Sequence, residues 1–118
     1  MSIRIENVEL DGRTVLAPLA GVTDRSFRTL CREQGASLAV TEMVCARRLA
    51  DGSEESSAHL DFETDETPIS VQVFGSDPDE MAAGAEAIAK REPDLIDINC
   101  GCPVKKIVNR NAGAALMR

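Results

Sequence analysis

The chain has 118 residues, of which 43% are hydrophobic, and a formal net charge of −7 at pH 7. It is long enough for one domain with its own core, too short for two, and too acidic to bind nucleic acid non-specifically over its whole surface. No apolar run approaches the roughly 20 residues that span a bilayer, and the charged start MSIRIENVEL lacks a signal-peptide core. We therefore expect a cytoplasmic protein with no membrane segment.

The first part of the chain predicts two strands around a helix. After a short lead, the apolar stretch 14-TVLAPLAG-21 indicates a strand that runs into a turn. Thr23 or Asp24 then caps a helix that Gly35 ends. A second short apolar strand is predicted at 37–44. The apolar face expected for the helix consists of Phe27, Leu30 and Cys31.

The acidic stretch 51–66 contains no Lys or Arg and is expected to be partly loop, with room for some helix. The next strand is predicted at 69–75, where β-branched residues alternate with others. A strong helix start follows, because Asp77 can cap, Pro78 suits the first helical position and Glu80 lies three residues after the cap. The buried stripe expected for this helix is Met81, Ala85, Ile88 and Ala89.

Glu92 and Pro93 end that helix, a fourth strand is predicted at 94–99, and a helix of small residues at 109–118. Strands that alternate with helices in this way indicate right-handed crossovers and a parallel sheet. A doubly wound open sheet and part of a (β/α)8 barrel both fit this order. The chain has neither GxGxxG after a strand nor a Walker-type glycine loop, which favours the barrel.

Active sites of parallel α/β folds lie where the strands end, and here each predicted strand ends in small or polar residues. Gln72 and Asn99 are amides at such ends, and a buried amide needs hydrogen-bond partners. A bound ligand and the neighbouring backbone are both possible partners. The other strand-end candidates are Pro18, Leu19, Ala20, Gly21, Glu42, Met43, Gly101 and Cys102.

The chain has four cysteines, too few and too irregular for a secreted disulfide framework. One CxC pair and the single His59 do not supply the four ligands of a structural zinc site, so we expect no metal. Cys31 and Cys100 are typical of buried small hydrophobic residues.

Cys102 differs from these cysteines because it follows a strand end, between Gly101 and Pro103. Glycine permits a tight turn there, and Lys105 and Lys106 could tune the thiol. No histidine is placed to activate a nucleophile, whereas a proton donor needs only position and protonation. The sequence therefore favours Cys102 as an acid.

Three segments together resemble the tRNA-dihydrouridine synthases, and their bacterial branch in particular. These are 17-APLAGVTDRSFRTLCRE-33, 71-VQVFGSDP-78 and 97-DINCGCPVKKIVNRNAGAALMR-118. The resemblance begins near residue 14 and continues to the last residue, and 51–66 carries least of it. The motifs APxAGVTD, VQxFG and INxGCPVxK are specific in this order and spacing.

The resemblance implies an FMN-containing (β/α)8 barrel with an appended helical RNA-binding domain. Such enzymes reduce the C5=C6 bond of uridines in tRNA, with NADPH recharging the flavin. It implies that hydride goes to C6 and that Cys102 donates a proton to C5. The residues that would contact the flavin are Pro18, Leu19, Ala20 and Gln72. Asn99 would help to hold the uracil, and Lys105, Lys106 and Arg110 would lie near the RNA.

Two residues depart from the family pattern: Leu19 replaces a frequent Met, and Cys100 replaces a plain apolar residue. Residues 1–118 would be the N-terminal part of the barrel, about four βα units, with the rest of the barrel and the helical domain absent. Such a fragment is expected to be inactive alone and to self-associate through exposed strand edges.

Two other interpretations stay open. Another FMN barrel that reduces a free pyrimidine is one, because dihydroorotate dehydrogenases also carry an Asn-x-x-Cys-Pro turn. The other is a catalytically silent scaffold or RNA-binding module, which would bind tRNA in a salt-dependent way without flavin.

Overall fold

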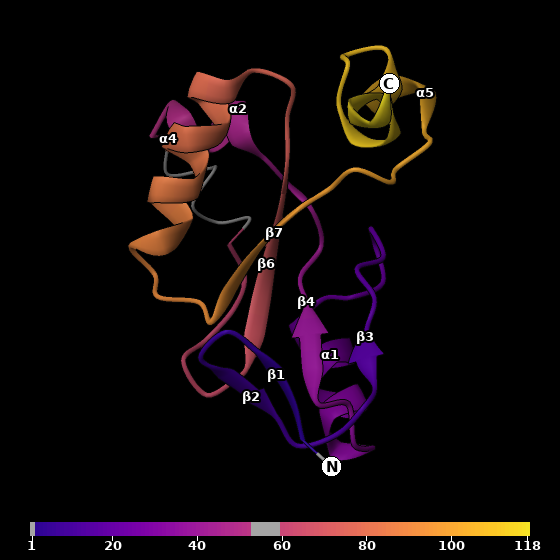
Figure 1. The fold of residues 1–118 in the computed structure, drawn as a ribbon, viewed down its shortest axis with the longest axis vertical. Helices are drawn as coiled ribbons and strands as arrows, with labels where there is room; N and C mark the ends of the chain where they lie inside the picture. The colour runs from indigo at the N-terminus through magenta and orange to yellow at the C-terminus, as the bar shows by residue number, and fades with distance from the viewer. Residues whose placement is uncertain (1, 53–59) are drawn as a thin grey trace.

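The strands of the main sheet all run parallel, as the sequence predicts. The computed structural model describes residues 2–52 and 60–118 (Figure 1), so the middle of the acidic stretch, with His59, lies outside the described part. The order across the sheet is β3 (Val15–Leu16), β4 (Leu38–Val40), β6 (Ile69–Phe74) and β7 (Leu95–Ile98). This mixed α/β architecture with a parallel sheet is consistent with part of a (β/α)8 barrel.

The predicted strand at 37–44 is interrupted. A separate segment, β5 (Val44–Cys45), pairs with the far end of β6, along the same edge that β4 uses. In the interruption, the Thr41 N–H donates to the Ser70 carbonyl at 2.9 Å, and the Thr41 hydroxyl accepts the Gln72 N–H at 3.2 Å. The hydroxyl thus takes the place of a strand carbonyl, and the chain bends without leaving the Gln72 N–H unpaired.

A β-hairpin precedes the sheet, where the sequence analysis expected only a short lead. Strand β1 (Ile3–Ile5) pairs antiparallel with β2 (Val8–Leu10). Val8 and Leu10 are buried with Leu38, so the hairpin packs against the amino end of the sheet (Figure 1). The alternation of apolar residues in IRIENVEL was the overlooked signal.

Helix α1 (Arg25–Glu33) begins as predicted, since the Asp24 carboxylate accepts the Phe27 N–H at 2.9 Å. Its expected apolar face is not buried: Phe27 is 38% exposed and Leu30 59%. The buried side chain of this helix is instead Arg28.

Arginines of α1 anchor the segment that leads into β6. The guanidinium of Arg28 contacts both carboxylate oxygens of Glu66, at 2.9 and 3.1 Å, and donates to the Thr23 carbonyl at 2.9 Å. Arg32 donates to the carbonyls of Glu66, Thr67 and Pro68. Burial lowers the pKa of Arg32, and the nearby carboxylate of Glu66 opposes this shift. Helix α1 is thus attached to its neighbours by hydrogen bonds and an ion pair, whereas the sequence predicted that an apolar face would pack there.

Helix α4 (Pro78–Ala89) has the predicted cap, because the Asp77 carboxylate accepts the N–H groups of Asp79 and Glu80 at 2.9 and 3.0 Å. Its buried residues are Gly84 and Ile88, whereas Ala89 of the predicted stripe is exposed. The reason is the short helix α2 (Ala46–Ala50), which packs on α4. A Cβ atom on Gly84 would lie 3.0 Å from the Ala46 Cα. The core between helices and sheet consists of Ala39, Val44, Ala46, Leu49, Leu60, Phe62, Ile69, Val71, Val73 and Ile88.

The C-terminal segment lies beyond the carboxyl end of the sheet (Figure 1). It forms a short helix, α5 (Lys105–Val108), and a 3-10 helix, η1 (Gly113–Met117), rather than the predicted single helix over 109–118. None of the helices in the described part of the chain is long and apolar enough to cross a membrane.

Candidate active site

An open cavity of about 330 Å³ lies at the carboxyl ends of the strands. It is lined by Pro18, Leu19, Ala20, Met43, Gln72, Asn99, Gly101, Cys102 and Pro103. All the residues that the sequence analysis assigned to flavin contact, uracil contact and proton donation are therefore brought together here. They come from three stretches far apart in the sequence, because parallel strands end at one edge of a sheet.

A chain of hydrogen bonds crosses the floor of this cavity. The Gln72 amide donates to the Asp97 carboxylate at 2.5 Å. The Asn99 amide donates to the Gln72 carbonyl oxygen at 3.0 Å. The Asn99 carbonyl oxygen then accepts the N–H groups of Gly101 and Cys102, at 3.2 and 3.0 Å. The partners of both amides are thus side chains and the following turn, whereas the sequence indicated a ligand or the neighbouring backbone.

The ends of this chain fix the orientation of both amides. A carboxylate such as Asp97 can only accept, so it selects the NH₂ side of Gln72. Two backbone N–H groups can only donate, so they select the oxygen of Asn99. The Gln72 oxygen is left facing the Asn99 NH₂ group, where it accepts. A ligand in the cavity therefore meets two amides whose donor and acceptor atoms are already set.

The backbone of Cys102 is held from two sides. Its N–H donates to Asn99, and its carbonyl oxygen accepts the Ala114 N–H at 3.0 Å. Gly113 lies against the same carbonyl with a φ of 61°, and a Cβ there would be 2.7 Å from the oxygen. The thiol itself is free and half-buried. The C-terminal segment therefore fixes the position of Cys102 from outside the cavity.

The structure does not require glycine at position 101, and it contradicts the expected burial of Cys100. Gly101 does not need the freedom of glycine, because its φ lies outside the left-handed region and a Cβ would meet nothing within 4 Å. Cys100 is exposed rather than buried. The conformational requirement falls on Gly113, eleven residues after Cys102.

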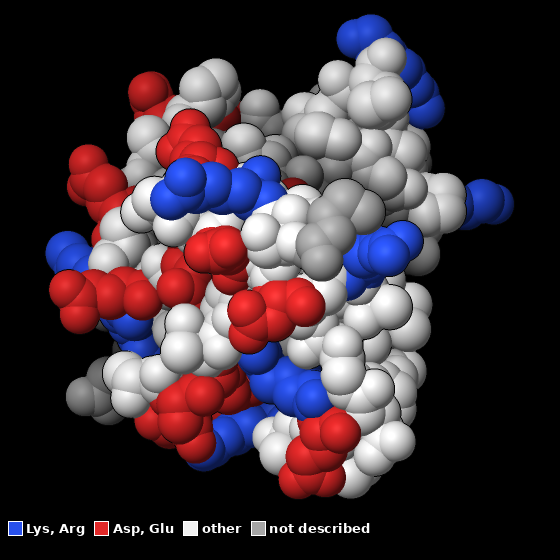
Figure 2. Space-filling view, turned by 60° about the horizontal axis from the view of Figure 1, so that its bottom comes forward, with Lys and Arg blue, Asp and Glu red and all other residues white. Residues whose placement is uncertain are grey.

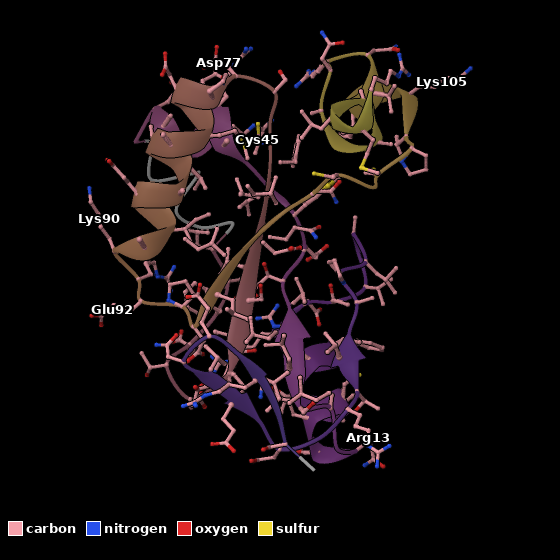
Figure 3. The ribbon with its side chains drawn as sticks, viewed as in Figure 1. Arg13, Cys45, Asp77, Lys90, Glu92 and Lys105 are labelled. Atoms are coloured by element: carbon pink, nitrogen blue, oxygen red, sulfur yellow. The ribbon has the colours of Figure 1, made fainter. Side chains whose placement is uncertain are left out.

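None of the three cations predicted to lie near the RNA lines the Cys102 cavity. Lys106 and Arg110 line a neighbouring cavity, whereas Lys105 points away from the molecule (Figure 3). Figure 2 shows Asp and Glu over the left and lower parts of one face, interspersed with Lys and Arg, whereas Lys and Arg occur without acids at its upper right, where the C-terminal segment lies. Among the described residues no group of three or more His, Cys, Asp or Glu could hold a metal ion.

Asp97 and Gly113 were missed as site residues. The signal for Asp97 was present: in 94-DLIDIN-99 it lies two residues before Asn99, with Ile98 between, which puts both polar side chains on one face of the strand. No comparable signal marks Gly113, since its role depends on a contact with the backbone of Cys102.

The chain thus has a parallel α/β sheet with a free thiol and two oriented amides at the strand ends. This places it among α/β domains that carry a site at the carboxyl ends of their strands. The family model for dihydrouridine synthase (Dus) matches residues 15–118. The chain belongs to this family.

Curated relatives share the same name, tRNA-dihydrouridine synthase B. The chain is 45% identical to that of Pseudomonas putida over 99% of its own length and 35% of the relative's. It is 45% identical to that of Xanthomonas campestris pv. campestris (90% and 32%) and 44% to that of Escherichia coli K12 (98% and 36%). The chain thus spans about a third of the length of these relatives.

Proposed function

We propose that residues 1–118 form the N-terminal part, about four βα units, of an FMN-binding (β/α)8 barrel in an enzyme that reduces uridine to 5,6-dihydrouridine in tRNA. NADPH is proposed as the reductant. The observation that carries this proposal is the single cavity that unites the Cys102 thiol with the Gln72 and Asn99 amides. The family and the names of the relatives support the choice of substrate.

The cavity has the features that a flavin ring requires. Its wall of Pro18, Leu19, Ala20 and Met43 is apolar, which suits the face of a flat ring. Gln72 offers an oriented amide to the polar edge of such a ring. No Lys or Arg of the described ranges lines the cavity, so the flavin phosphate would be bound by residues outside this lining. A reduced flavin bound here would supply the hydride that C6 of the uracil receives.

Cys102 would deliver the proton to C5. Charge that grows on the uracil as C6 is reduced is stabilised when an acid protonates C5, and a thiol needs only to be positioned for this step. The turn held by Asn99 and Gly113 supplies that position. After transfer the sulfur carries the negative charge, and solvent can reprotonate it because the side chain is only half-buried.

Asn99 keeps one N–H for the substrate. Its oxygen already accepts two backbone N–H groups, and one of its own N–H groups is donated to Gln72. The remaining N–H can donate to a carbonyl oxygen of uracil. We therefore assign Asn99 as a donor to the base rather than as an acceptor from its ring N–H.

The test is Cys102→Ala in the protein with the whole chain that its gene encodes, with Cys100→Ala as the control. Loss of a general acid typically lowers a rate by about 10²–10⁴-fold. We expect Cys102→Ala to keep bound flavin and lose dihydrouridine formation to that extent, measured by mass spectrometry of digested tRNA. Cys100, which is exposed and lines no wall of the cavity, should be dispensable. Unchanged turnover in Cys102→Ala would refute the assignment, and reduction of free orotate instead of tRNA would refute the substrate.

A further inference from the structure

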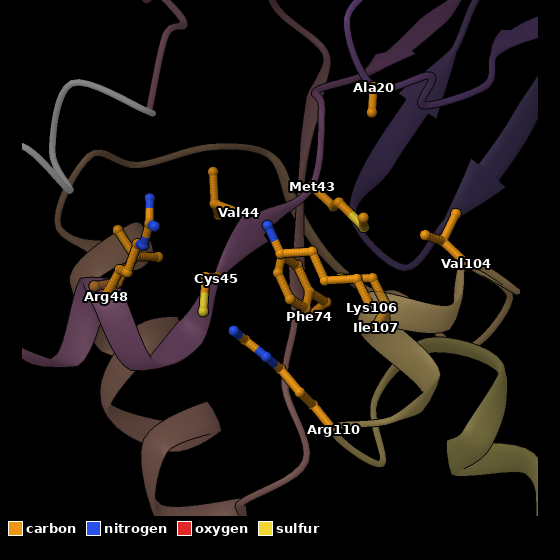
Figure 4. A pocket seen from close by; sticks show the side chains of 11 residues that line it. Ala20, Met43, Val44, Cys45, Arg48, Phe74, Val104, Lys106, Ile107 and Arg110 are labelled. Carbon is orange, nitrogen blue, oxygen red and sulfur yellow. The ribbon is translucent and has the colours of Figure 1, made fainter.

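A second cavity, of about 400 Å³, opens beside the cavity of Cys102 (Figure 4). The two share Ala20 and Met43 as a common wall. The described residues that line it are Ala20, Met43, Val44, Cys45, Arg48, Leu49, Phe74, Val104, Lys106, Ile107 and Arg110. A group bound here would therefore sit directly next to whatever occupies the Cys102 cavity.

The lining combines an apolar wall with positive charge. Lys106 and Arg110 extend toward the interior of the cavity, on the side of Phe74 and Cys45 (Figure 4). Among the described residues, no Asp or Glu lines the cavity, although the chain as a whole carries a net charge of −7. Arg48 adds a third cation, which has an interaction of its own, whereas Lys106 and Arg110 supply the charge that a ligand would meet. The local charge is thus opposite in sign to that of the protein.

We propose that this cavity binds the nucleotide adjacent to the target uridine in the RNA strand. Its base would pack on the Phe74 ring and the aliphatic wall, and its phosphate would contact Lys106 and Arg110. An aromatic face accepts any base, and cations bind phosphate without regard to sequence. This inference rests on the proposed function, because it takes the Cys102 cavity as the place of the uridine.

Because the two cavities are adjacent, a nucleotide bound in the second one would help the uridine to enter the first. A uridine must leave its stack to enter the Cys102 cavity, which costs stacking energy on both sides. A second cavity that binds the neighbouring base recovers part of that energy, and the bound phosphate holds the strand in the distorted path. The contact should therefore strengthen RNA binding without discriminating strongly between bases.

The experiment compares Phe74→Leu with wild type, in the flavin-loaded enzyme with the whole chain that its gene encodes. Binding is measured by fluorescence anisotropy, with substrate tRNA and with two versions that lack the base immediately 5′ or 3′ of the target uridine. Stacking on an aromatic side chain contributes on the order of tenfold in affinity. We expect one missing base to weaken wild-type binding by that factor. Phe74→Leu should bind intact tRNA equally weakly and should not respond to the same missing base.

Lys106→Ala and Arg110→Ala provide a test that does not depend on packing, since both side chains are exposed. Each should reduce the slope of log affinity against log salt by about one. Phe27→Leu on the exposed side of α1 and Lys90→Ala at the end of α4 are the matched controls, and neither should change binding.

Pocket variants that bind tRNA like wild type while dihydrouridine forms normally would overturn this inference and leave the proposed function standing. Variants that weaken tRNA binding in an enzyme that does not reduce uridine would support the nucleotide site and refute the proposed function. A raised KM for NADPH with unchanged tRNA binding would overturn the inference and indicate that the cavity binds the reductant.

Discussion

Gly113→Ala is the sharpest test of how the thiol of Cys102 is positioned. Gly113 does not line the cavity, and it packs against the carbonyl oxygen and the Cβ of Cys102. Its φ of 61° is in the left-handed region, which costs a residue with a Cβ about 1–2 kcal/mol. The new Cβ would also lie 2.7 Å from the Cys102 carbonyl oxygen and 2.8 Å from a methyl group of Ile107. The substitution therefore adds both backbone strain and a collision.

Gly52→Ala separates these two effects. Gly52 has a φ of 66°, close to that of Gly113, but a Cβ there would meet nothing within 4 Å. Both variants should lose about 1–2 kcal/mol of unfolding free energy from the backbone alone. Only Gly113→Ala must also move the Cys102 carbonyl, by about 0.3 Å to reach even the 3.0 Å that real Cβ contacts respect.

A misplacement of 1 Å near a reacting centre can cost on the order of 10²-fold in rate. A displacement of a few tenths of an ångström at Cys102 should then lower dihydrouridine formation by about tenfold. Denaturant unfolding measures the shared stability loss, and single-turnover assays on tRNA measure the rate. Equal rates in Gly113→Ala and Gly52→Ala would show that the contact behind Cys102 does not position the thiol.

Two further predictions concern the polar networks. Asp97→Ala removes the acceptor that orients Gln72, and hydrogen bonds to charged groups contribute about 1.5–3 kcal/mol. It should weaken flavin binding by about tenfold or more, measured by flavin fluorescence, whereas Asp97→Asn keeps an acceptor oxygen and should be milder; equal affinities in the two variants would contradict the orienting role. Glu66→Gln leaves the buried Arg28 guanidinium without its counter-charge and should cost about 3 kcal/mol of unfolding free energy in denaturant titration. The exposed pair of Arg47 with Glu80 offers the control, since Arg47→Ala should leave the unfolding midpoint unchanged. If Glu66→Gln unfolded at the same midpoint as Arg47→Ala, burial would not be what makes the Arg28 pair important.

The location of the candidate site could be predicted from sequence because it depends on topology. Once β6 and β7 are recognised as parallel neighbours, Gln72 and Asn99 must lie at the same edge of the sheet. The Asp77 cap could be predicted for a similar reason, since its bonds reach only two and three residues along the chain. Local and topological rules were sufficient for these features.

Features that depend on contacts between distant segments were not predictable in the same way. The interior position of Arg28 follows from Glu66, which lies 38 residues away in a stretch that the sequence marks only as acidic. The buried face of α4 is rotated because α2 approaches Gly84 closely. Periodicity gives the apolar side of a helix, but it does not say which neighbour will cover it or whether an ion pair will replace apolar packing.

The hydrogen-bond chain on the cavity floor also links the two proposed binding events. Gln72, assigned to the flavin, and Asn99, assigned to the uracil, are bonded to each other, and Asn99 is bonded to the backbone of Cys102. A change in one amide would therefore reorient the other and shift the turn that carries the thiol. Asp97 fixes one end of this chain by orienting Gln72, and the N–H groups of Gly101 and Cys102 fix the other end by orienting Asn99. The geometry of the site thus depends in part on the Asp97 carboxylate, which lies just before the motif INxGCPVxK and is not included in it.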